Sequence, residues 1–463
     1  MPPVPPPPST PDPWGERLPR RLGLISAWAV LVGSTIGSGI FRTPAVVAER
    51  VQDPALFLGG WIVGGLLALA GALSYAELAA LYPRTGGMYV YIREAFGRAP
   101  AFLFGWAELL IIRPAAYGAI AITSAEYFWR LMGVNGATAV GPVSIAQLAA
   151  ALFIVIVAAV NYRGIQLGAV IQNASTVFKV GALLGLIALG FLLPHDAGLF
   201  ADRTVTAAPT IAPAAAFGVA MVAILWAYDG WADVAFVSGE VRDPQRLLPR
   251  ALVLGTLTVV VLYLGAIAVY WYIVPLDQMP GSPLIAADAA QAVLGTAGVV
   301  FVSLAIMVST FGTLNGSMMT GPRVFFAMAE DRLFFRRLAD VHPRFGSPAH
   351  SIVLAAVLGV IFVSIRTFAE LADQFIIGIW PFYALAVAAV FVLRRRRPDL
   401  ARPYRVWGYP VVPLLFLLAS VYLLGNYMVS EPLTFAVDVL VILSGIPIYV
   451  LWGRWQRRRA SVT

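Results

Sequence analysis

The chain has 463 residues with a formal net charge of +8, and 60% of them are hydrophobic while only 12% are charged. With a mean hydropathy of +0.81, this composition excludes an ordinary soluble globule and indicates a protein of the lipid bilayer. Because the sequence contains no cysteine, disulfides, a disulfide-linked partner subunit, thiolate metal sites and thiol nucleophiles are all excluded.

The first segment, residues 1–21, begins with a run that is mostly proline up to Pro13. Such a run cannot build a packed core, and it lacks the basic region with which a secretory signal starts. We therefore predict a disordered cytoplasmic tail that is not cleaved.

Twelve apolar segments follow, and most reach the roughly 20 residues that a helix needs to cross a hydrocarbon core of about 30 Å. The predicted fold class is therefore an all-α membrane protein with twelve transmembrane helices. The segments cover about 24–47, 56–82, 101–130, 144–161, 168–193, 213–238, 250–274, 296–322, 351–366, 374–393, 411–428 and 433–452. The three histidines, His195, His342 and His350, fall in the predicted loops. No metal site, cofactor or catalytic residue is expected in the membrane, which argues against an enzyme.

The positions of the basic residues test this segmentation independently of hydropathy. If both termini are cytoplasmic, 25 of the 32 lysines and arginines fall in cytoplasmic segments, including a basic C-terminal tail, 453–463. Such an excess is typical of the cytoplasmic side of a membrane protein. We therefore attribute the net positive charge to the basic residues that orient the protein in the membrane, and nucleic acid is not expected as a partner.

Two of the apolar segments, the first and the sixth, are interrupted by glycine-containing sequences: Gly33–Gly39 (GSTIGSG) and Tyr228-Asp229-Gly230. Glycine weakens a helix, and backbone without helical partners survives at membrane depth only where it lines a cavity. The pairing predicts that helices 1 and 6 are unwound around a polar site. Two inverted five-helix repeats, 22–193 and 213–393, would then be followed by two extra helices in 411–452.

The first interruption offers both kinds of backbone group to a ligand. The half-helix that begins near Ser38-Gly39 presents N–H groups and a positive dipole end, which suit a carboxylate. The half-helices that end near Thr35 and Trp226 present carbonyl oxygens, which suit an ammonium group. A zwitterion would satisfy both. The alternative is that the glycines only allow close helix packing.

Four stretches of the sequence form a combined pattern: GSTIGSGIF at 33–41, YPRTGGMYVYIREAFG at 82–97, WAYDGW at 226–231 with Gly239-Glu240 and Pro249-Arg250-Ala251, and STFGTLNGSMMTGPR at 309–323. Together they resemble a known family, the L-type amino acid transporters of the amino acid, polyamine and organocation superfamily. The similarity extends from Leu22 to Pro403 and is nearest to bacterial serine/threonine and alanine-serine-cysteine exchangers. It implies the inverted-repeat fold of the bacterial leucine transporter, alternating access, and sodium-independent transport in a bacterial inner membrane.

The resemblance also assigns roles to individual residues. Backbone N–H groups of Gly37, Ser38 and Gly39 would bind the substrate carboxylate, and the carbonyls of Thr35, Trp226 and Asp229 would receive its amine. Trp226 aligns with a family position usually held by phenylalanine, which closes over the bound amino acid as an outer gate. Its other interpretation is a packing or interfacial tryptophan.

Two ionisable residues near the interruptions carry further alternatives. The Asp229 carboxylate could favour cationic substrates or cap a broken helix end, and we prefer the cap. Lys179, the only lysine, lies near the middle of the fifth segment. It either contacts the carbonyls freed by the first interruption, as a fixed substitute for sodium, or acts as a proton carrier. Both behaviours are known in resembling families, and snorkelling to an interface is the remaining alternative.

Charged residues elsewhere are given structural or gating roles. Glu108, Arg113 and Pro114 form a group in the third segment that is read as a buried pair or a coupling element, and Arg113 is not assigned to substrate. The loops 82–97 and 239–249 mix acidic and basic residues at cytoplasmic helix ends. They would be solvated faces or state-dependent ion pairs of an inner gate.

The function predicted from these residues is sodium-independent exchange of neutral L-amino acids by alternating access. Proton-coupled amino acid symport is the alternative within transporters, and a transporter-like membrane sensor is the alternative of another class. A channel is not expected, because the sequence shows one enclosed polar site and no repeated filter motif.

Overall fold

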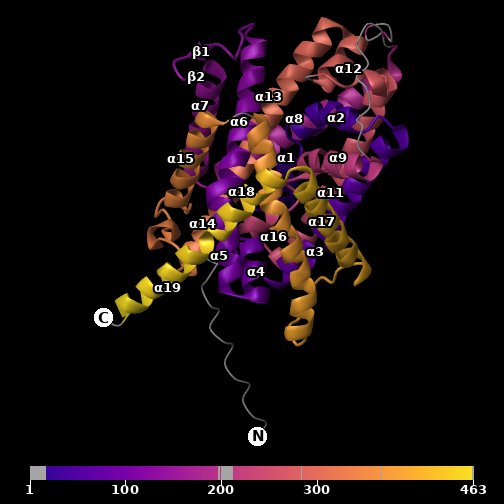
Figure 1. Ribbon diagram of the computed structural model, residues 1–463. Helices are drawn as coiled ribbons and strands as arrows, with labels where there is room; N and C mark the ends of the chain where they lie inside the picture. Colours follow the sequence, from indigo (N-terminus) through magenta and orange to yellow (C-terminus); the bar gives the residue numbers. More distant parts are fainter. Residues whose placement is uncertain are drawn as a thin grey trace.

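The computed structural model describes residues 17–194, 196, 199, 212–282, 284–366 and 368–460 (Figure 1). Most of the predicted N-terminal tail lies outside this part, but its last five residues do not behave as a tail. Leu18 is buried, and the N–H groups of Arg21 and Leu22 donate to the carbonyl of Glu240 at 2.8 and 2.9 Å. The folded body therefore begins at least five residues earlier than the sequence analysis placed it.

The first half of the chain is helical apart from one small hairpin. Its elements are α1 (Leu24–Thr35), α2 (Gly39–Arg50), α3 (Pro54–Leu81), α4 (Met88–Phe96), α5 (Arg98–Ala107), η1 (Glu108–Ile112), α6 (Arg113–Leu131), the antiparallel pair β1 (Ala139–Val140) and β2 (Val143–Ser144), α7 (Ile145–Tyr162) and α8 (Ile165–Leu192). Local sequence explains two boundaries. The Asp53 side chain caps the start of α3, and Ser144 with Gln147 forms a capping box at the start of α7.

The second half of the chain continues in the same way. Its elements are α9 (Pro213–Tyr228), α10 (Asp233–Phe236), η3 (Ser238–Glu240), α11 (Pro244–Ile273), η4 (Leu276–Gln278), α12 (Ile285–Leu294), α13 (Thr296–Thr320), α14 (Pro322–Glu330), η5 (Arg336–Ala339), α15 (Ala349–Ile365), α16 (Phe368–Arg396), α17 (Val411–Ser430), α18 (Pro432–Leu443) and α19 (Gly445–Ala460). The third span bends where the π-turn η1 meets Pro114, which has no N–H to donate to the preceding turn.

Within the described residues, ten helical stretches are long and apolar enough to cross a bilayer, and three apolar helices are shorter: Pro213–Tyr228, Ile285–Leu294 and Ala349–Ile365. Three local expectations were wrong. The loop predicted over 82–97 contains α4, and the connection before the eighth predicted span contains α12. His350 lies in the first turn of α15 instead of a loop. Helix α19 extends through residue 460, so the first part of the basic C-terminal tail is helical.

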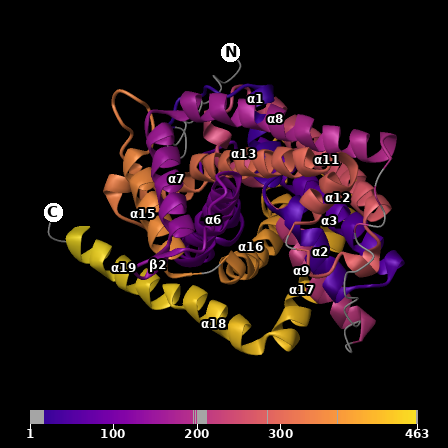
Figure 2. The same ribbon diagram turned by 90° about the horizontal axis from the view of Figure 1, so that it is seen from above.

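The helices surround α6, which packs against α7, α13, α15 and α16. Seen from above, α18 and α19 run along one outer edge of the bundle (Figure 2). Their outward residues are among the most exposed apolar side chains, with Leu433 at 82% and Leu440 at 66%. In a bilayer this edge faces lipid, whereas the small residues of α1 lie in the centre of the protein.

One buried carboxylate links α3 to the segment that leads to the outer helices. Glu77 of α3 accepts hydrogen bonds from Arg394 at 2.6 and 2.9 Å and from the Val406 N–H at 2.7 Å. The Arg402 guanidinium lies 3.4 Å from the same carboxylate. Arg394 also stacks on the Tyr409 ring at 3.7 Å. The end of α16 and the connection to α17 are thus fixed to α3.

Candidate functional site

The candidate site lies where two helical stretches are interrupted. Helix α1 ends at Thr35 and α2 begins at Gly39, while α9 ends at Tyr228 and α10 begins only at Asp233. Each interruption therefore overlaps the glycine-containing sequence from which it was predicted. The residues between these ends have turn or bend geometry, so their N–H and C=O groups are not committed to a continuous helix.

The two interruptions touch each other through their glycines. Gly230 has a φ of +110°, and a Cβ there would lie 2.8 Å from the Thr35 nitrogen. A Cβ on Gly39 would lie 2.5 Å from the Cα of Ala227. Both distances are too short for any side chain, so this approach of backbone to backbone requires glycine at both positions.

A cavity of about 50 Å³ lies between the interrupted segments. A single water needs about 10–15 Å³ measured in this way, so the cavity has room for a small solute. It is lined by Ser34, Thr35, Gly37, Ser38, Gly39, Arg113, Ala116, Ile120, Trp226, Asp229, Gly230, Asp233, Thr313, Ser317 and Phe375. All six residues that the sequence assigned to the two ends of a substrate are in this set.

The backbone donors expected to meet a carboxylate differ from one another in the structure. The N–H of Gly37 donates to the Thr35 carbonyl at 2.8 Å. The N–H groups of Ser38 and Gly39 donate to no described residue, and they stand at the start of α2, where the helix dipole is positive. Of the three predicted donors, Ser38 and Gly39 are therefore the two that are available to an anionic group in this conformation.

The carbonyl oxygens expected to receive an amine also differ. The Thr35 carbonyl accepts from the Tyr263 hydroxyl at 2.9 Å in addition to the Gly37 N–H. Both of its lone pairs are then occupied, which could not be predicted from the sequence. The Trp226 carbonyl accepts a hydrogen bond from the Asp229 N–H at 3.3 Å. An incoming amine would have to displace one of the two partners of the Thr35 carbonyl.

Lys179 of α8 is fully buried beside the first interruption. Its Nζ donates to the carbonyl oxygens of Gly33, Ile36 and Ser309, each at 2.8 Å, and to the Thr313 hydroxyl at 3.1 Å. One of the four oxygens belongs to α1, one to the first residue of the interruption and two to α13. A compact cation surrounded by oxygen atoms therefore joins these segments, and snorkelling to an interface is excluded by this position.

The Asp229 side chain has a different partner from the one the sequence suggested. Its Oδ1 accepts a hydrogen bond from the Tyr383 hydroxyl of α16 at 2.8 Å, and no side-chain cap is present at the start of α10. The preferred interpretation of Asp229 as a helix cap was therefore wrong. On the opposite wall, Trp226 packs edge-on against Phe375, with ring centroids 5.3 Å apart. These two aromatic rings close one side of the cavity.

A buried charge cluster forms another wall of the cavity. Arg113 Nε lies 2.6 Å from Glu108 Oε2, and its Nη2 lies 3.5 Å from Asp233 Oδ1. Asp233 also accepts from the Thr320 hydroxyl at 3.2 Å. The sequence analysis found the pair Glu108 and Arg113 but missed Asp233. No spacing in the sequence pointed to it, because Asp229 lies in the interruption and Asp233 begins α10, so the two do not share a helix face.

Ion pairs join helices and loops to one another on the face of the molecule where the described chain begins. Arg323 and Glu240 are both fully buried and paired at 2.9 Å, and Arg93 of α4 pairs with Asp331 at 2.9 Å. Asp331 also accepts from the Tyr89 hydroxyl at 3.0 Å. Burial and the neighbouring Asp331 carboxylate raise the pKa of Tyr89 well above its usual value, so the phenol remains a donor.

The fold and the site together define a multi-pass helical membrane protein with a small polar cavity between interrupted helices. Residues 22–452 match the model of a protein family that is described as "Amino acid permease". The serine/threonine exchanger SteT of Bacillus subtilis is 34% identical over 447 residues, which cover 96% of this chain and 98% of SteT.

Two human proteins are similar over the same length. The b(0,+)-type amino acid transporter 1 is 31% identical, covering 96% of this chain and 90% of that protein. The large neutral amino acids transporter small subunit 2 is 29% identical, covering 96% and 82%. The chain therefore belongs to the amino acid permease family, and the resemblance found in its sequence is confirmed.

Proposed function

We propose that this protein exchanges neutral L-amino acids across a bacterial inner membrane by alternating access, without sodium. The name of SteT, a serine/threonine exchanger, supports exchange of small neutral amino acids. The cavity supports it as well, because a space of about 50 Å³ is lined by Trp226 and by Ser38 and Gly39, whose N–H groups donate to no described residue. A small zwitterion would meet an electropositive end and an electronegative end.

The proposed architecture has twelve spans with both termini in the cytoplasm. Ten long helical stretches and the shorter helices Pro213–Tyr228 and Ala349–Ile365 together supply twelve. Repeats 22–193 and 213–393, each with an interruption in its first helix, would then be inverted, because each has five spans. Residues 411–452 would supply the two extra helices, and the basic tail 453–463 would follow on the cytoplasmic side.

The observation that carries sodium-independent exchange is the position of Lys179. Its ammonium group already lies among four oxygen atoms from α1, the first interruption and α13, as a bound metal cation would. A fixed positive charge there makes a co-transported cation unnecessary. Ser38, Gly39 and Trp226 are the proposed contacts for the two ends of the amino acid, with Asp229 nearby and Trp226 acting also as a gate.

Counterflow in proteoliposomes tests this proposal. Vesicles preloaded with unlabelled serine should accumulate external radiolabelled serine, in sodium-free buffer and with equal pH on both sides, and empty vesicles should not. Saturation with external serine and competition by the other neutral amino acids would define the substrate class. A matched set of vesicles without protein gives the background.

Two results would redirect the proposal. Accumulation in empty vesicles driven by an acid exterior would favour proton-coupled symport, with Lys179 as the proton carrier. Saturable serine binding without any flux in either assay would favour a transporter-like sensor. If sodium were required for flux, the assignment of Lys179 as a substitute for that ion would be wrong.

A further inference from the structure

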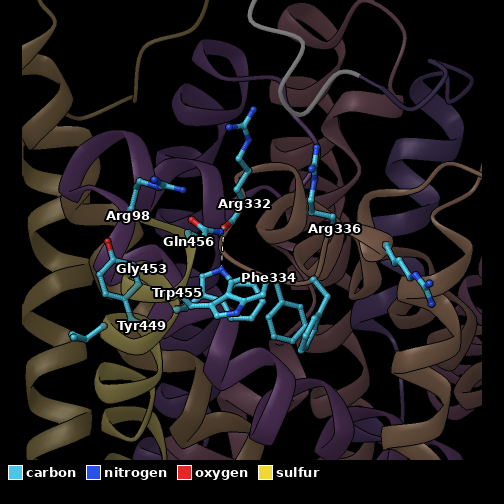
Figure 3. Close-up of a pocket in the computed structure, with 12 residues that line it drawn as sticks. Arg98, Arg332, Phe334, Arg336, Tyr449, Gly453, Trp455 and Gln456 are labelled. Carbon is cyan, nitrogen blue, oxygen red and sulfur yellow. Dashed lines mark hydrogen bonds between the residues drawn. The ribbon is translucent and has the colours of Figure 1, made fainter. Parts of the chain in front are cut away.

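A second hollow lies far from the amino acid cavity, between the end of α19 and the segment that joins α14 to η5 (Figure 3). Its volume is about 1150 Å³, and it is open on one side. It lies on the face where the described chain begins, because Arg17 donates to the carbonyl of Ala339 in η5 at 3.0 Å. The proposed function uses none of its residues.

The hollow is strongly basic. Four arginines line it, Arg98, Arg332, Arg336 and Arg337, and all four are exposed. None of the described lining residues is acidic. Arg98 lies 3.6 Å from the carboxylate of Asp331, a buried residue that is also bound to Arg93 and Tyr89. An excess of positive charge remains around the other three arginines, and an anion would be attracted to it.

Aromatic side chains form the other wall of the hollow. The Trp452 ring lies 5.2 Å from Phe335 and 5.3 Å from Trp455, and its Nε1 donates to the carbonyl of Arg332 at 3.1 Å. Gln456 donates to the same carbonyl. Figure 3 shows the guanidinium groups of Arg98, Arg332 and Arg336 on one side of this aromatic layer. Charge and apolar surface thus lie side by side.

The depth of the hollow matches the edge of a bilayer. The apolar stretch Pro432–Gln456 has 25 residues. Its last turn carries Trp452 and Trp455 and is followed by three arginines, residues 457–459. Tryptophans followed by arginines at the end of an apolar stretch are typical of the headgroup level of a bilayer.

We propose that this hollow, between α19 and the connection from α14 to η5, binds the phosphate headgroup of an anionic phospholipid, with its acyl chains along α19. Arginine is suited to phosphate because its planar group can donate two hydrogen bonds. The exposed rings of Phe335 (60%) and Trp455 (44%) supply the apolar contact that a soluble anion would not need. The C-terminal residues 457–463 (RRRASVT) are an unsuitable occupant, since they add three arginines and no acid.

Lipid titration followed by native mass spectrometry tests the proposal on the purified, delipidated full-length chain. Phosphatidylglycerol and phosphatidylcholine with the same acyl chains are added separately. The wild type should bind one phosphatidylglycerol preferentially. The double variant Arg336→Gln/Arg337→Gln should lose about tenfold in that affinity, and phosphatidylcholine binding should not change. Arg336→Lys/Arg337→Lys keeps both charges and should retain most of it.

The matched control is Arg246→Gln/Arg250→Gln, which removes two exposed arginines of α11 from the same face of the protein. It should bind phosphatidylglycerol like the wild type. Equal loss in both glutamine variants would mean a diffuse charge effect and would overturn the proposal. Equal binding of the two lipids by the wild type would do the same.

A soluble headgroup separates a lipid from a free anion. Glycerol phosphate should displace phosphatidylglycerol only weakly, because it lacks the acyl chains that contact Trp455 and Phe335. Displacement at similar concentrations would identify a site for a free phosphate compound and overturn the assignment to lipid. As an independent measure, phosphatidylglycerol with brominated chains should quench tryptophan fluorescence less in Trp452→Phe/Trp455→Phe than in the wild type.

Discussion

Two buried cations lie beside the interrupted helices, and they are compensated in opposite ways. Lys179 donates to three backbone carbonyls and one hydroxyl, and none of these four partners is a carboxylate. Arg113 lies between two carboxylates, those of Glu108 and Asp233. Dipoles compensate the first charge, and opposite charges compensate the second.

The difference shows which cation is linked to the shape of the backbone. The oxygens of Gly33 and Ile36 can point at Lys179 only because α1 ends at Thr35. If that interruption straightened, the ammonium group would lose partners in a medium that offers no water. The carboxylates around Arg113 are side chains and do not depend on an unwound turn. We expect substitutions at the two sites to affect transport and stability differently.

The largest expected effect is the loss of transport in Lys179→Ala. The change leaves the oxygens of Gly33, Ile36 and Ser309 without their shared donor, at about 1–3 kcal/mol for each buried unsatisfied group. Counterflow of serine should fall at least about 100-fold, the equivalent of about 2.7 kcal/mol. The matched control is Val177→Ala. Val177 lies two residues before Lys179 in the chain but is 69% exposed on the side that faces lipid, so this variant should behave like the wild type.

Adding salt to the Lys179→Ala variant tests more directly whether the ammonium group acts as a fixed cation. Lys179→Ala leaves a space bounded by four oxygen atoms, which suits a hard cation. If sodium chloride, but not choline chloride, restores part of the counterflow, the ammonium group acts as a fixed cation. No effect of sodium, together with flux that follows a pH gradient in the wild type, would contradict that role.

A second large effect, on stability instead of transport, concerns Arg113. Glu108→Gln removes the closer of its two carboxylate partners and should lower stability by about 3–5 kcal/mol, the usual cost of breaking a buried pair. Asp233→Asn, whose carboxylate is 3.5 Å away, should cost less. Thermal unfolding of the two purified variants measures the order. A smaller shift for Glu108→Gln than for Asp233→Asn would show that the distances do not rank the two partners.

Gly39→Ala should have an intermediate effect. Its Cβ would lie 2.5 Å from the Ala227 Cα, so α2 and α9 must separate, at about 1–3 kcal/mol for overpacking. Gly37→Ala is the matched control, because its Cβ would meet only the Thr313 side chain at 3.3 Å. Serine affinity should fall in Gly39→Ala and change little in Gly37→Ala. Equal affinities would argue against the close approach of the two interruptions.

The smallest effect is expected for Tyr383→Phe, which removes only the hydroxyl that donates to Asp229. The ring can still pack on Trp231, so the loss should be about 1 kcal/mol, the net value of one hydrogen bond. The KM for serine should rise about fivefold. Tyr162→Phe removes the same atom far from the cavity and should leave KM unchanged.

The sequence predicted the positions of the two interruptions because glycine and membrane depth act locally. It also singled out Lys179, since a lone lysine in an apolar span is costly unless it has a function. It did not predict that Tyr263 and Gly37 fill the Thr35 carbonyl, because the phase of α11 relative to α1 is set by tertiary packing. The Asp229 partner was missed for the same reason, as Tyr383 lies more than 150 residues further along the chain.

The helices, too, divide into those that the local sequence predicts and those that it does not. The long spans were visible from hydropathy, whereas α4 and α12 were not. Helix α4 has only nine residues and carries charged groups, so it does not stand out from a loop by composition. Its Tyr89 and Arg93 become informative only once Asp331, which they bind, is brought beside them by the fold.

The carboxylate of Glu77 has a mechanical consequence. It binds Arg394, Arg402 and the Val406 N–H, and it therefore holds the segment that leads into α17 against α3. The entry into α17 is therefore coupled mechanically to α3, and a tilt of α3 within the membrane would move the start of α17 with it.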